Sequence, residues 1–186
     1  MPQKQGRADA DQALRIARRT FIRGERVEMP ALAESVGVSR VTLFRWFGNR
    51  DALLATINWT LAEPVLLSAR ERATGHGGAR VAAVMSEFAA VVNAAPFFTA
   101  FLRREPERAL RVLTTQAADF QARVIGWTSE LLREEVAGGH LDPPLPIDDL
   151  AFLLVRITES FVYTDSITGN RADSDKVDAA VRALLR

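Results

Sequence analysis

A predicted helix near the N-terminus carries side chains that suit contact with DNA bases. At 100° per residue, Val41, Thr42 and Arg45 fall on one side of this helix. Leu43 and Phe47 fall on the opposite side and are expected to face inward. Guanidinium groups bind guanine edges in a major groove, and valine or threonine can contact a thymine methyl. The same spacing also fits an ordinary surface helix, so the pattern alone leaves both interpretations open.

The preceding residues contain the signals needed to position such a helix. Leu32, Ala33 and Val36 repeat at three- and four-residue spacing, which predicts a first short helix with one apolar face. Gly37 follows, where a helix end favours a residue that adopts the left-handed conformation. Ser39 is a good N-cap for the next helix. Two short helices joined by a turn containing glycine form a helix-turn-helix unit.

The segment 36–54 resembles the DNA-binding signature of the TetR family of bacterial one-component regulators. The family pattern is Ala-Gly-Val-Ser, two variable residues, Thr-Leu-Tyr, one variable residue, an aromatic residue and Phe, followed by a Lys and a Leu-Leu pair. This chain reads Val-Gly-Val-Ser-Arg-Val-Thr-Leu-Phe-Arg-Trp-Phe and continues Gly-Asn-Arg-Asp-Ala-Leu-Leu. The signature covers about the first quarter of the chain, and the rest resembles the family in length and helical pattern.

The resemblance implies DNA contacts at particular positions of this sequence. Arg40 would contact base edges and Arg50, at the position of the family lysine, would bind phosphate. Phe44 replaces the usual tyrosine and lacks its hydroxyl, whereas the Trp46 indole N–H can still donate to a phosphate. Glu28 occupies a position where the family often has a phosphate-binding Thr or Ser, which removes that contact. The candidate DNA-binding residues are Arg40, Val41, Thr42, Phe44, Arg45, Trp46 and Arg50.

Composition and charge favour a phosphate-binding N-terminal region and argue against an enzyme or a membrane protein. The net charge of +1 combines +5 in residues 1–50 (10 basic, 5 acidic) with −4 in residues 51–186 (14 basic, 18 acidic). A basic N-terminal region suits phosphate binding. The chain has no cysteine, two isolated histidines and no phosphate-loop spacing, so we expect no catalytic site, metal site or cofactor. We also expect no signal peptide and no membrane span, and hence a cytoplasmic protein.

Hydrophobic periodicity predicts an all-α fold. We expect a three-helix helix-turn-helix head in residues 1–50 and a helical effector-binding and dimerisation body in residues 51–186. Pro64 should kink or break the helix that begins near residue 50, either as a lever between head and body or simply as a separator. The expected helices span residues 9–23, 30–36, 40–47, 50–72, 79–93, 106–137, 147–167 and 175–186, with a short aromatic segment between residues 96 and 106.

Large side chains of the body are candidates to line an effector pocket, although a filled core would use the same residues. Arg156, Glu159 and Tyr163 share one helical stripe, which suits a buried network, a ligand contact or a subunit interface. The segment 154–165 is also similar to the QsdR-like subgroup of the TetR family, which implies an acyl or lactone-like effector. The candidate ligand-binding residues are Phe88, Asn93, Phe97, Phe98, Phe101, Phe120, Trp127, Phe152, Glu159 and Tyr163.

Taken with the resemblance, these features predict a homodimeric, ligand-responsive transcriptional repressor. Its partners would be double-stranded operator DNA, a small apolar effector and a second copy of the chain, with no membrane. The last two long helices of each subunit would form a four-helix interface, and the two heads would meet a palindromic operator in major grooves roughly 34–36 Å apart. Two alternatives remain open, namely a ligand-independent DNA-binding protein and a helical protein-interaction adaptor.

Overall fold

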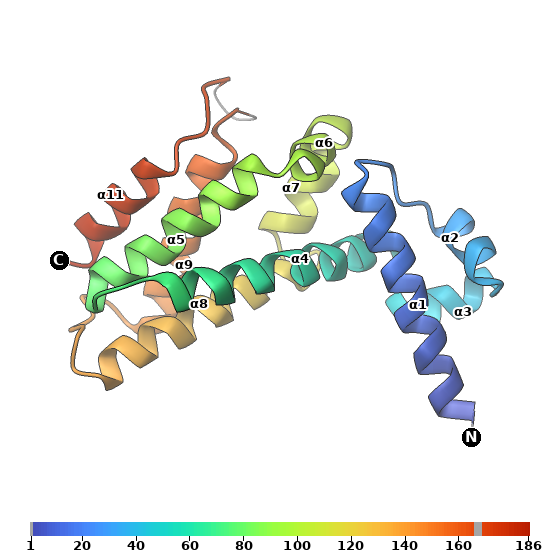
Figure 1. The fold of residues 1–186 in the computed structure, drawn as a ribbon, viewed down its shortest axis with the longest axis horizontal. Helices are drawn as coiled ribbons and strands as arrows, with labels where there is room; N and C mark the ends of the chain where they lie inside the picture. The colour runs from blue at the N-terminus through green and yellow to red at the C-terminus, as the bar shows by residue number, and fades with distance from the viewer. Residues whose placement is uncertain (1, 166–168) are drawn as a thin grey trace. The chain divides into compact units, whose positions relative to one another are not determined.

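A computed structural model of the chain describes residues 2–165 and 169–186, with side chains from residue 9 onward. The prediction of an all-α fold is confirmed, because these residues form ten helices and no strand (Figure 1). The first helix begins earlier than residue 9, where it was predicted to start. The helices are α1 (Pro2–Ile22), α2 (Met29–Val36), α3 (Arg40–Phe47), α4 (Arg50–Arg72), α5 (Gly77–Ala94), α6 (Pro96–Arg104), α7 (Pro106–Thr114), α8 (Phe120–Ala137), α9 (Ile147–Val162) and α11 (Asp175–Leu184).

The helices group into two compact units, each built from two stretches of the chain. The first unit contains Met1–Thr60 and Pro96–Gln121, and the second contains Leu61–Ala95 and Ala122–Arg186. Helices α6 and α7 therefore belong with the N-terminal helices, although they lie far from them in sequence. The predicted division of roles at residue 50 concerns DNA and effector binding, and it stays a prediction.

The first unit is organised around the apolar face of α1. This helix packs on α2 and α6, α2 packs on α3, and α6 packs on α7. Ala13, Ala17 and Phe21 recur every fourth residue and are at most 3% exposed. The Phe21 ring lies 5.9 Å from the Phe97 ring and 5.2 Å from the Phe101 ring, measured between centroids. Aromatic packing thus joins α1 to α6.

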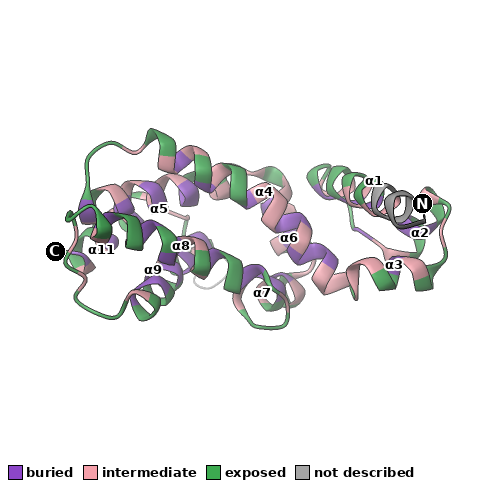
Figure 2. Cartoon of the chain, turned by 90° about the horizontal axis from the view of Figure 1, so that it is seen from below, coloured by how far each residue is buried: buried purple, intermediate pink, exposed green. Residues whose placement is uncertain are grey.

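The second unit has a core shared by three helices. Helix α5 packs on both α9 and α11, which also contact each other. Their buried and exposed residues alternate with helical period, as the burial colours of Figure 2 show. The side chains that meet in this core are fully buried: Val81 and Met85 of α5, Leu150 and Leu154 of α9, and Val177 and Val181 of α11.

Helix α4 does not break at Pro64. It runs continuously from Arg50 to Arg72, so a separation into two helices at this proline is ruled out. Proline removes the bond to the carbonyl four residues earlier, at a cost of about 3 kcal/mol in a helix interior. Leu66 and Ala69 lie just beyond Pro64 and are fully buried, and burial of this kind offsets the lost bond.

By length and composition alone, α4 also carries an apolar stretch that could cross a membrane. Its mean hydropathy is 1.3 over 18 residues, and 44% of that stretch is buried. Among the described residues, the only other segment to pass this test is the pair α5 and α6, which is bent by 69°. Core helices of globular proteins have the same composition, so this is weak evidence for a membrane span.

The single helix predicted over residues 106–137 is wrong, because the chain forms α7 and α8 with a break between them. The hydroxyls of Thr114 and Thr115 donate to the carbonyls of Leu110 and Arg111, at 2.7 and 2.6 Å. Thr115 is extended, with φ −127° and ψ 170°, and its hydroxyl accepts from the Ala117 amide. Side chains that bond to nearby backbone groups compete with helix continuation. The apolar periodicity of this segment concealed that competition.

Candidate DNA interface and the ionic junction beside it

The turn between α2 and α3 has the predicted local chemistry. Gly37 adopts the left-handed conformation with φ 73°. Its amide donates to the Glu34 carbonyl and the Val38 amide donates to the Ala33 carbonyl, both at 3.0 Å. These two bonds close the end of α2 in the manner of a Schellman motif, which favours glycine at this position. The prediction that Gly37 ends the first helix of the helix-turn-helix, α2, is confirmed.

Helix α3 begins with a side-chain cap and presents two different faces. The Ser39 hydroxyl accepts from the Thr42 amide at 3.1 Å, which confirms the predicted N-cap. Leu43 is fully buried, whereas Val41 and Phe44 are 79% and 61% exposed. Large apolar side chains exposed this far on one short helix suit a binding surface.

The outer face of α3 also carries two cations. Arg40 and Arg45 are exposed, and within the part of the chain that the structure describes neither forms an ion pair. We call the outer face of α3, formed by Arg40, Val41, Phe44 and Arg45, the recognition face. Its exposed guanidinium groups can bind base edges or phosphates without first breaking an internal bond.

Thr42 and Trp46 border the recognition face and are half-buried. The Thr42 hydroxyl lies 2.9 Å from the Ser39 hydroxyl, and either oxygen can donate. The Trp46 ring packs edge-on against Phe47, with centroids 6.4 Å apart. Both side chains are therefore held in place by α3 itself while part of their surface stays exposed.

Arg50, which was expected to bind a DNA phosphate, is largely buried and binds other groups of the protein. Its side chain is only 11% exposed, and its two terminal nitrogens bind both carboxylate oxygens of Glu105 at 2.5 and 2.7 Å. The remaining Nε donates to the Val27 carbonyl at 2.5 Å. The bonds that Arg50 donates to Glu105 raise the pKa of Arg50 above its ordinary value, although burial opposes the shift. The guanidinium that was expected to bind phosphate instead binds Glu105 and the Val27 carbonyl.

Further charges surround this pair. Arg108 lies 3.6 Å from Glu105 and 3.4 Å from Asp51, and Arg111 binds Asp51 at 2.6 Å. We call these five residues, Arg50, Asp51, Glu105, Arg108 and Arg111, the ionic junction. The hydrogen bonds from Arg50 lower the pKa of Glu105, despite the opposing effect of burial. The ionic junction ties the start of α4 to α7, and nothing in the sequence pairs residues this far apart.

The predicted ligand-binding residues do not form one group. Phe97, Phe98, Phe101 and Phe120 belong to the first unit, and the other six belong to the second. Phe97 and Phe101 pack on Phe21, and the space beside these rings measures about 10 Å³. That is roughly the volume a single water molecule needs. At this place the aromatic side chains fill a core, which was the alternative to a pocket.

The candidates of the second unit differ widely in exposure. Phe88, Glu159 and Tyr163 are at most 9% exposed, Asn93 and Trp127 are half-buried, and Phe152 is 49% exposed. Arg156 binds Glu159 at 2.6 Å, but its own side chain is 46% exposed, so this ion pair on α9 is only partly buried. Burial raises the pKa of Tyr163 far above its ordinary value, and the nearby Glu159 charge adds to the shift.

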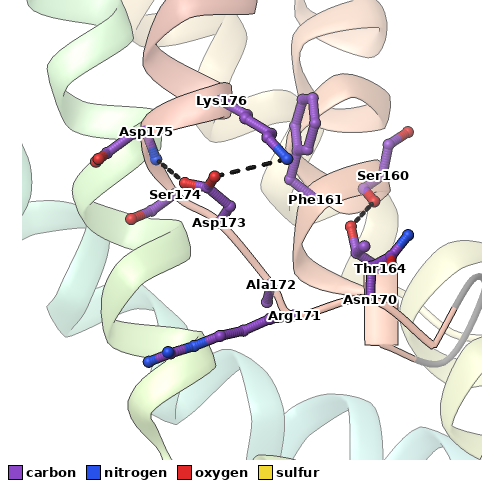
Figure 3. Close-up of a pocket in the computed structure, with 10 residues that line it drawn as sticks. All are labelled: Ser160, Phe161, Thr164, Asn170, Arg171, Ala172, Asp173, Ser174, Asp175 and Lys176. Carbon is purple, nitrogen blue, oxygen red and sulfur yellow. Dashed lines mark hydrogen bonds and ion pairs between the residues drawn. The ribbon is translucent and has the colours of Figure 1, made fainter.

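An open groove of about 940 Å³ lies where α9 ends and α11 begins (Figure 3). Most of the residues that line it are polar, and Lys176 lies 3.6 Å from Asp173 within it. None of the ten predicted ligand-binding residues lines this groove. The lining residues are Ser160, Phe161, Thr164, Asn170, Arg171, Ala172, Asp173, Ser174, Asp175 and Lys176.

Three solved structures that resemble this fold are those of regulators. The chain is 27% identical to the transcriptional repressor QsdR of R. erythropolis, with a TM-score of 0.88 over 96% of this chain and 94% of that chain. It is 13% identical to the fatty acid degradation regulator FadR of Bacillus halodurans, with a TM-score of 0.56 over 95% and 94%. FadR of Bacillus subtilis, solved in complex with stearoyl-CoA, is also 13% identical, with a TM-score of 0.56 over 94% and 96%.

Two family models match the sequence. Residues 14–57 match "Bacterial regulatory proteins, tetR family", and residues 76–186 match "Tetracyclin repressor-like, C-terminal domain". No curated protein sequence matches the chain. The first match contains the helix-turn-helix unit and its recognition face, and the second covers more than half of the chain. The chain is therefore a member of the TetR family of transcriptional regulators, with an N-terminal helix-turn-helix.

Proposed function

We propose that this regulator is a homodimeric transcriptional repressor that binds a palindromic operator and is released by a small apolar effector. The recognition face carries the DNA-binding part of the proposal. Val41 and Phe44 are exposed there, and Arg40 and Arg45 are exposed without an ion-pair partner in the described chain. A helix capped at its start and held by the buried Leu43 keeps these side chains in a defined arrangement.

Base and phosphate contacts divide along α3. Residues at the N-terminal end of a recognition helix contact base edges, so we assign Arg40 and Val41 to sequence readout and Arg45 to base or backbone contact. Phe44 supplies apolar contact at the groove wall. Thr42 and Trp46 retain exposed surface and can donate to phosphates, which set position rather than sequence. Arg50 acts in this scheme by holding α4 to α7 rather than by binding phosphate.

The dimer interface is expected on α8 and α9. Phe152 and Leu153 are 49% and 37% exposed on α9, although the opposite side of this helix is fully buried. Adjacent exposed apolar side chains favour a self-complementary contact between two copies. Two heads held about 34–36 Å apart would then fit successive major grooves.

The effector site is proposed in the second unit. Phe88, Asn93, Trp127, Glu159 and Tyr163 remain the candidates there, with an acyl or lactone-like compound as the ligand class. The resemblance of residues 154–165 to the QsdR-like subgroup supports this choice, and FadR of Bacillus subtilis, which has a similar fold, was solved with the acyl thioester stearoyl-CoA. An effector weakens DNA binding only by its differential affinity for the two states. A tenfold change requires about 1.4 kcal/mol. Such a regulator works in the cytoplasm, where the DNA is.

The DNA-binding proposal is tested by titrating promoter-proximal DNA with the wild-type protein, Arg40→Ala and Arg186→Ala across a salt series. We expect wild-type affinity to fall steeply with salt. Arg40→Ala should lose about 1–3 kcal/mol of specific binding, whereas Arg186→Ala, which lies outside the helix-turn-helix, should match wild type. A folded dimer that binds no promoter-proximal DNA at any salt would overturn the proposal.

The effector proposal needs a separate measurement on the same complex. Acylated lactones and acyl thioesters of increasing chain length are added to the protein–DNA complex at constant salt. We expect release by one of these classes, and a weaker response in Trp127→Ala, whose DNA affinity without ligand should be unchanged. DNA binding that is insensitive to both classes would favour the ligand-independent alternative.

A further inference from the structure

The chain contains two histidines, and the structure brings them together. His76 directly precedes α5 and His140 follows α8, so they lie far apart in sequence. Their rings stack with centroids 4.1 Å apart and an interplanar angle of 26°. Both side chains are exposed, and both lie in the second unit. The prediction that the histidines are isolated is therefore wrong.

A buried carboxylate lies beside the two rings. The Glu135 side chain is 4% exposed, and its Oε2 lies 3.7 Å from His140 Nδ1. The same oxygen accepts from the Gly77 amide at 2.6 Å, while Oε1 pairs with Arg80. Burial acts to raise the pKa of Glu135, but the bonds from Gly77 and Arg80 outweigh it and lower the pKa below its ordinary value. The bonds from Gly77 and Arg80 therefore hold the carboxylate in place beside His140.

Two glycines leave the space that this cluster needs. Gly77 has a φ of 62°, and a Cβ at this position would collide with the His140 carbonyl oxygen. A Cβ on Gly138 would lie 2.7 Å from His140 Nδ1. Larger residues at either position would push His140 away from Glu135.

We propose that His76, Glu135 and His140 form a binding site for a divalent transition-metal ion, with Zn²⁺ as the best match. One ligand atom from each residue lies within 4.8 Å of the others. Ligand atoms around a tetrahedral zinc ion lie about 3.4 Å apart, given bonds of about 2.0–2.2 Å. The exposed imidazole rings can rotate to close this difference. Two imidazoles favour zinc, nickel or copper over magnesium or calcium.

The surroundings of the carboxylate fit this role. Arg80 holds Oε1 of Glu135, which orients the other oxygen towards the histidines in the manner of an outer-shell partner. Three protein ligands leave a fourth position for water or another ligand. A bound ion would join the start of α5 to the end of α8. This inference does not depend on DNA binding.

The test titrates untagged, chelator-treated full-length protein with zinc chloride in an isothermal titration calorimeter. We expect one Zn²⁺ per chain, and at least tenfold weaker binding in His76→Ala and in His140→Ala. The matched control is Glu134→Gln, because this neighbouring carboxylate on α8 pairs with Arg70 at 2.6 Å and is not part of the cluster. The control should bind zinc like wild type.

Two further measurements separate loss of a ligand from loss of folding. Co²⁺ should give a visible absorption band in the wild type and no band in the double variant His76→Ala/His140→Ala. Zinc should raise the Tm of the wild type but not of the double variant, because only an ion bound to the native state stabilises it. Absence of saturable zinc binding by the wild type, or equal binding by the folded double variant, would overturn the proposal.

Discussion

The recognition face and the ionic junction lie in the same compact unit and use the same residue type in opposite ways. Arg40 and Arg45 extend from α3 as exposed cations without an ion-pair partner in the described chain. Arg50 begins the next helix, is 11% exposed, and is bound by Glu105 through both terminal nitrogens. A basic segment therefore does not identify its own DNA contacts, because the surroundings of each guanidinium decide whether it can meet a phosphate.

The comparison also limits how far a family pattern can be transferred to individual residues. Arg50 stands where the TetR signature has a lysine, so its position implied a phosphate contact. A lysine ammonium is a compact point charge, whereas the planar guanidinium matches a carboxylate with two parallel bonds. Glu105 provides that carboxylate. The replacement of lysine by arginine thus coincides with an internal ion pair.

Substitutions on the inner and outer sides of α3 should differ more in their effect on stability than any other pair proposed here. Leu43→Ala should lower the free energy of unfolding by about 2–5 kcal/mol, because the leucine is fully buried. Val41→Ala, on the recognition face, should stay within about 0.5 kcal/mol of wild type and instead weaken operator binding. Urea denaturation measures the first quantity and DNA titration the second. Equal destabilisation by the two variants would contradict the division into inner and outer faces.

Loss of the carboxylate at the ionic junction should also reduce stability. Glu105→Gln removes the charge that pairs with Arg50, and bonds to charged groups contribute about 1.5–3 kcal/mol. The control is Glu107→Gln, since this residue is exposed in the first turn of α7, two residues after Glu105. Urea denaturation of both variants should show the loss in Glu105→Gln alone. If both variants unfold like wild type, the ionic junction contributes no stability.

Measuring stability as a function of pH should also reveal the contribution of the Glu105 carboxylate. Because the folded-state pKa of Glu105 is lowered, its stabilisation is present above the ordinary glutamate value of about 4.3 and is lost as pH falls through the lower folded value. The stability difference between wild type and Glu105→Gln should therefore shrink below pH 4.3. Glu135 also has a lowered pKa. Because wild type and Glu105→Gln both contain Glu135, its effect cancels in the stability difference between them. A constant difference down to pH 2 would contradict the assignment.

The smallest effect concerns the cap of α3. Ser39→Ala should cost about 1 kcal/mol of stability, because the Thr42 amide loses its acceptor. Ser39→Asp keeps a capping oxygen, so it should retain stability while its negative charge weakens DNA binding. Thermal unfolding and DNA titration on both variants separate these outcomes. A stable Ser39→Ala protein would show that the cap does not hold the recognition face.

Local features of the candidate site were predictable because their partners are close in sequence. Gly37 and Ser39 act within three or four residues of their own position, and Asn49 caps α4 by accepting from the Ala52 amide at 2.9 Å. The break between α7 and α8 was not predicted. It depends on hydrogen bonds between the Thr114 and Thr115 hydroxyls and nearby backbone groups, and these bonds are visible only in the folded chain. Apolar spacing carries no information about these bonds.

Helical periodicity and caps are local, so the residues alone were enough to predict the all-α class, the helix-turn-helix and the face of α3 that points outward. The pairing of Arg50 with Glu105 and the stacking of His76 on His140 beside Glu135 become visible only in the folded chain. Long stretches of chain separate Arg50 from Glu105 and His76 from His140. Their meeting depends on how the apolar faces of the intervening helices pack, which no spacing in the sequence encodes.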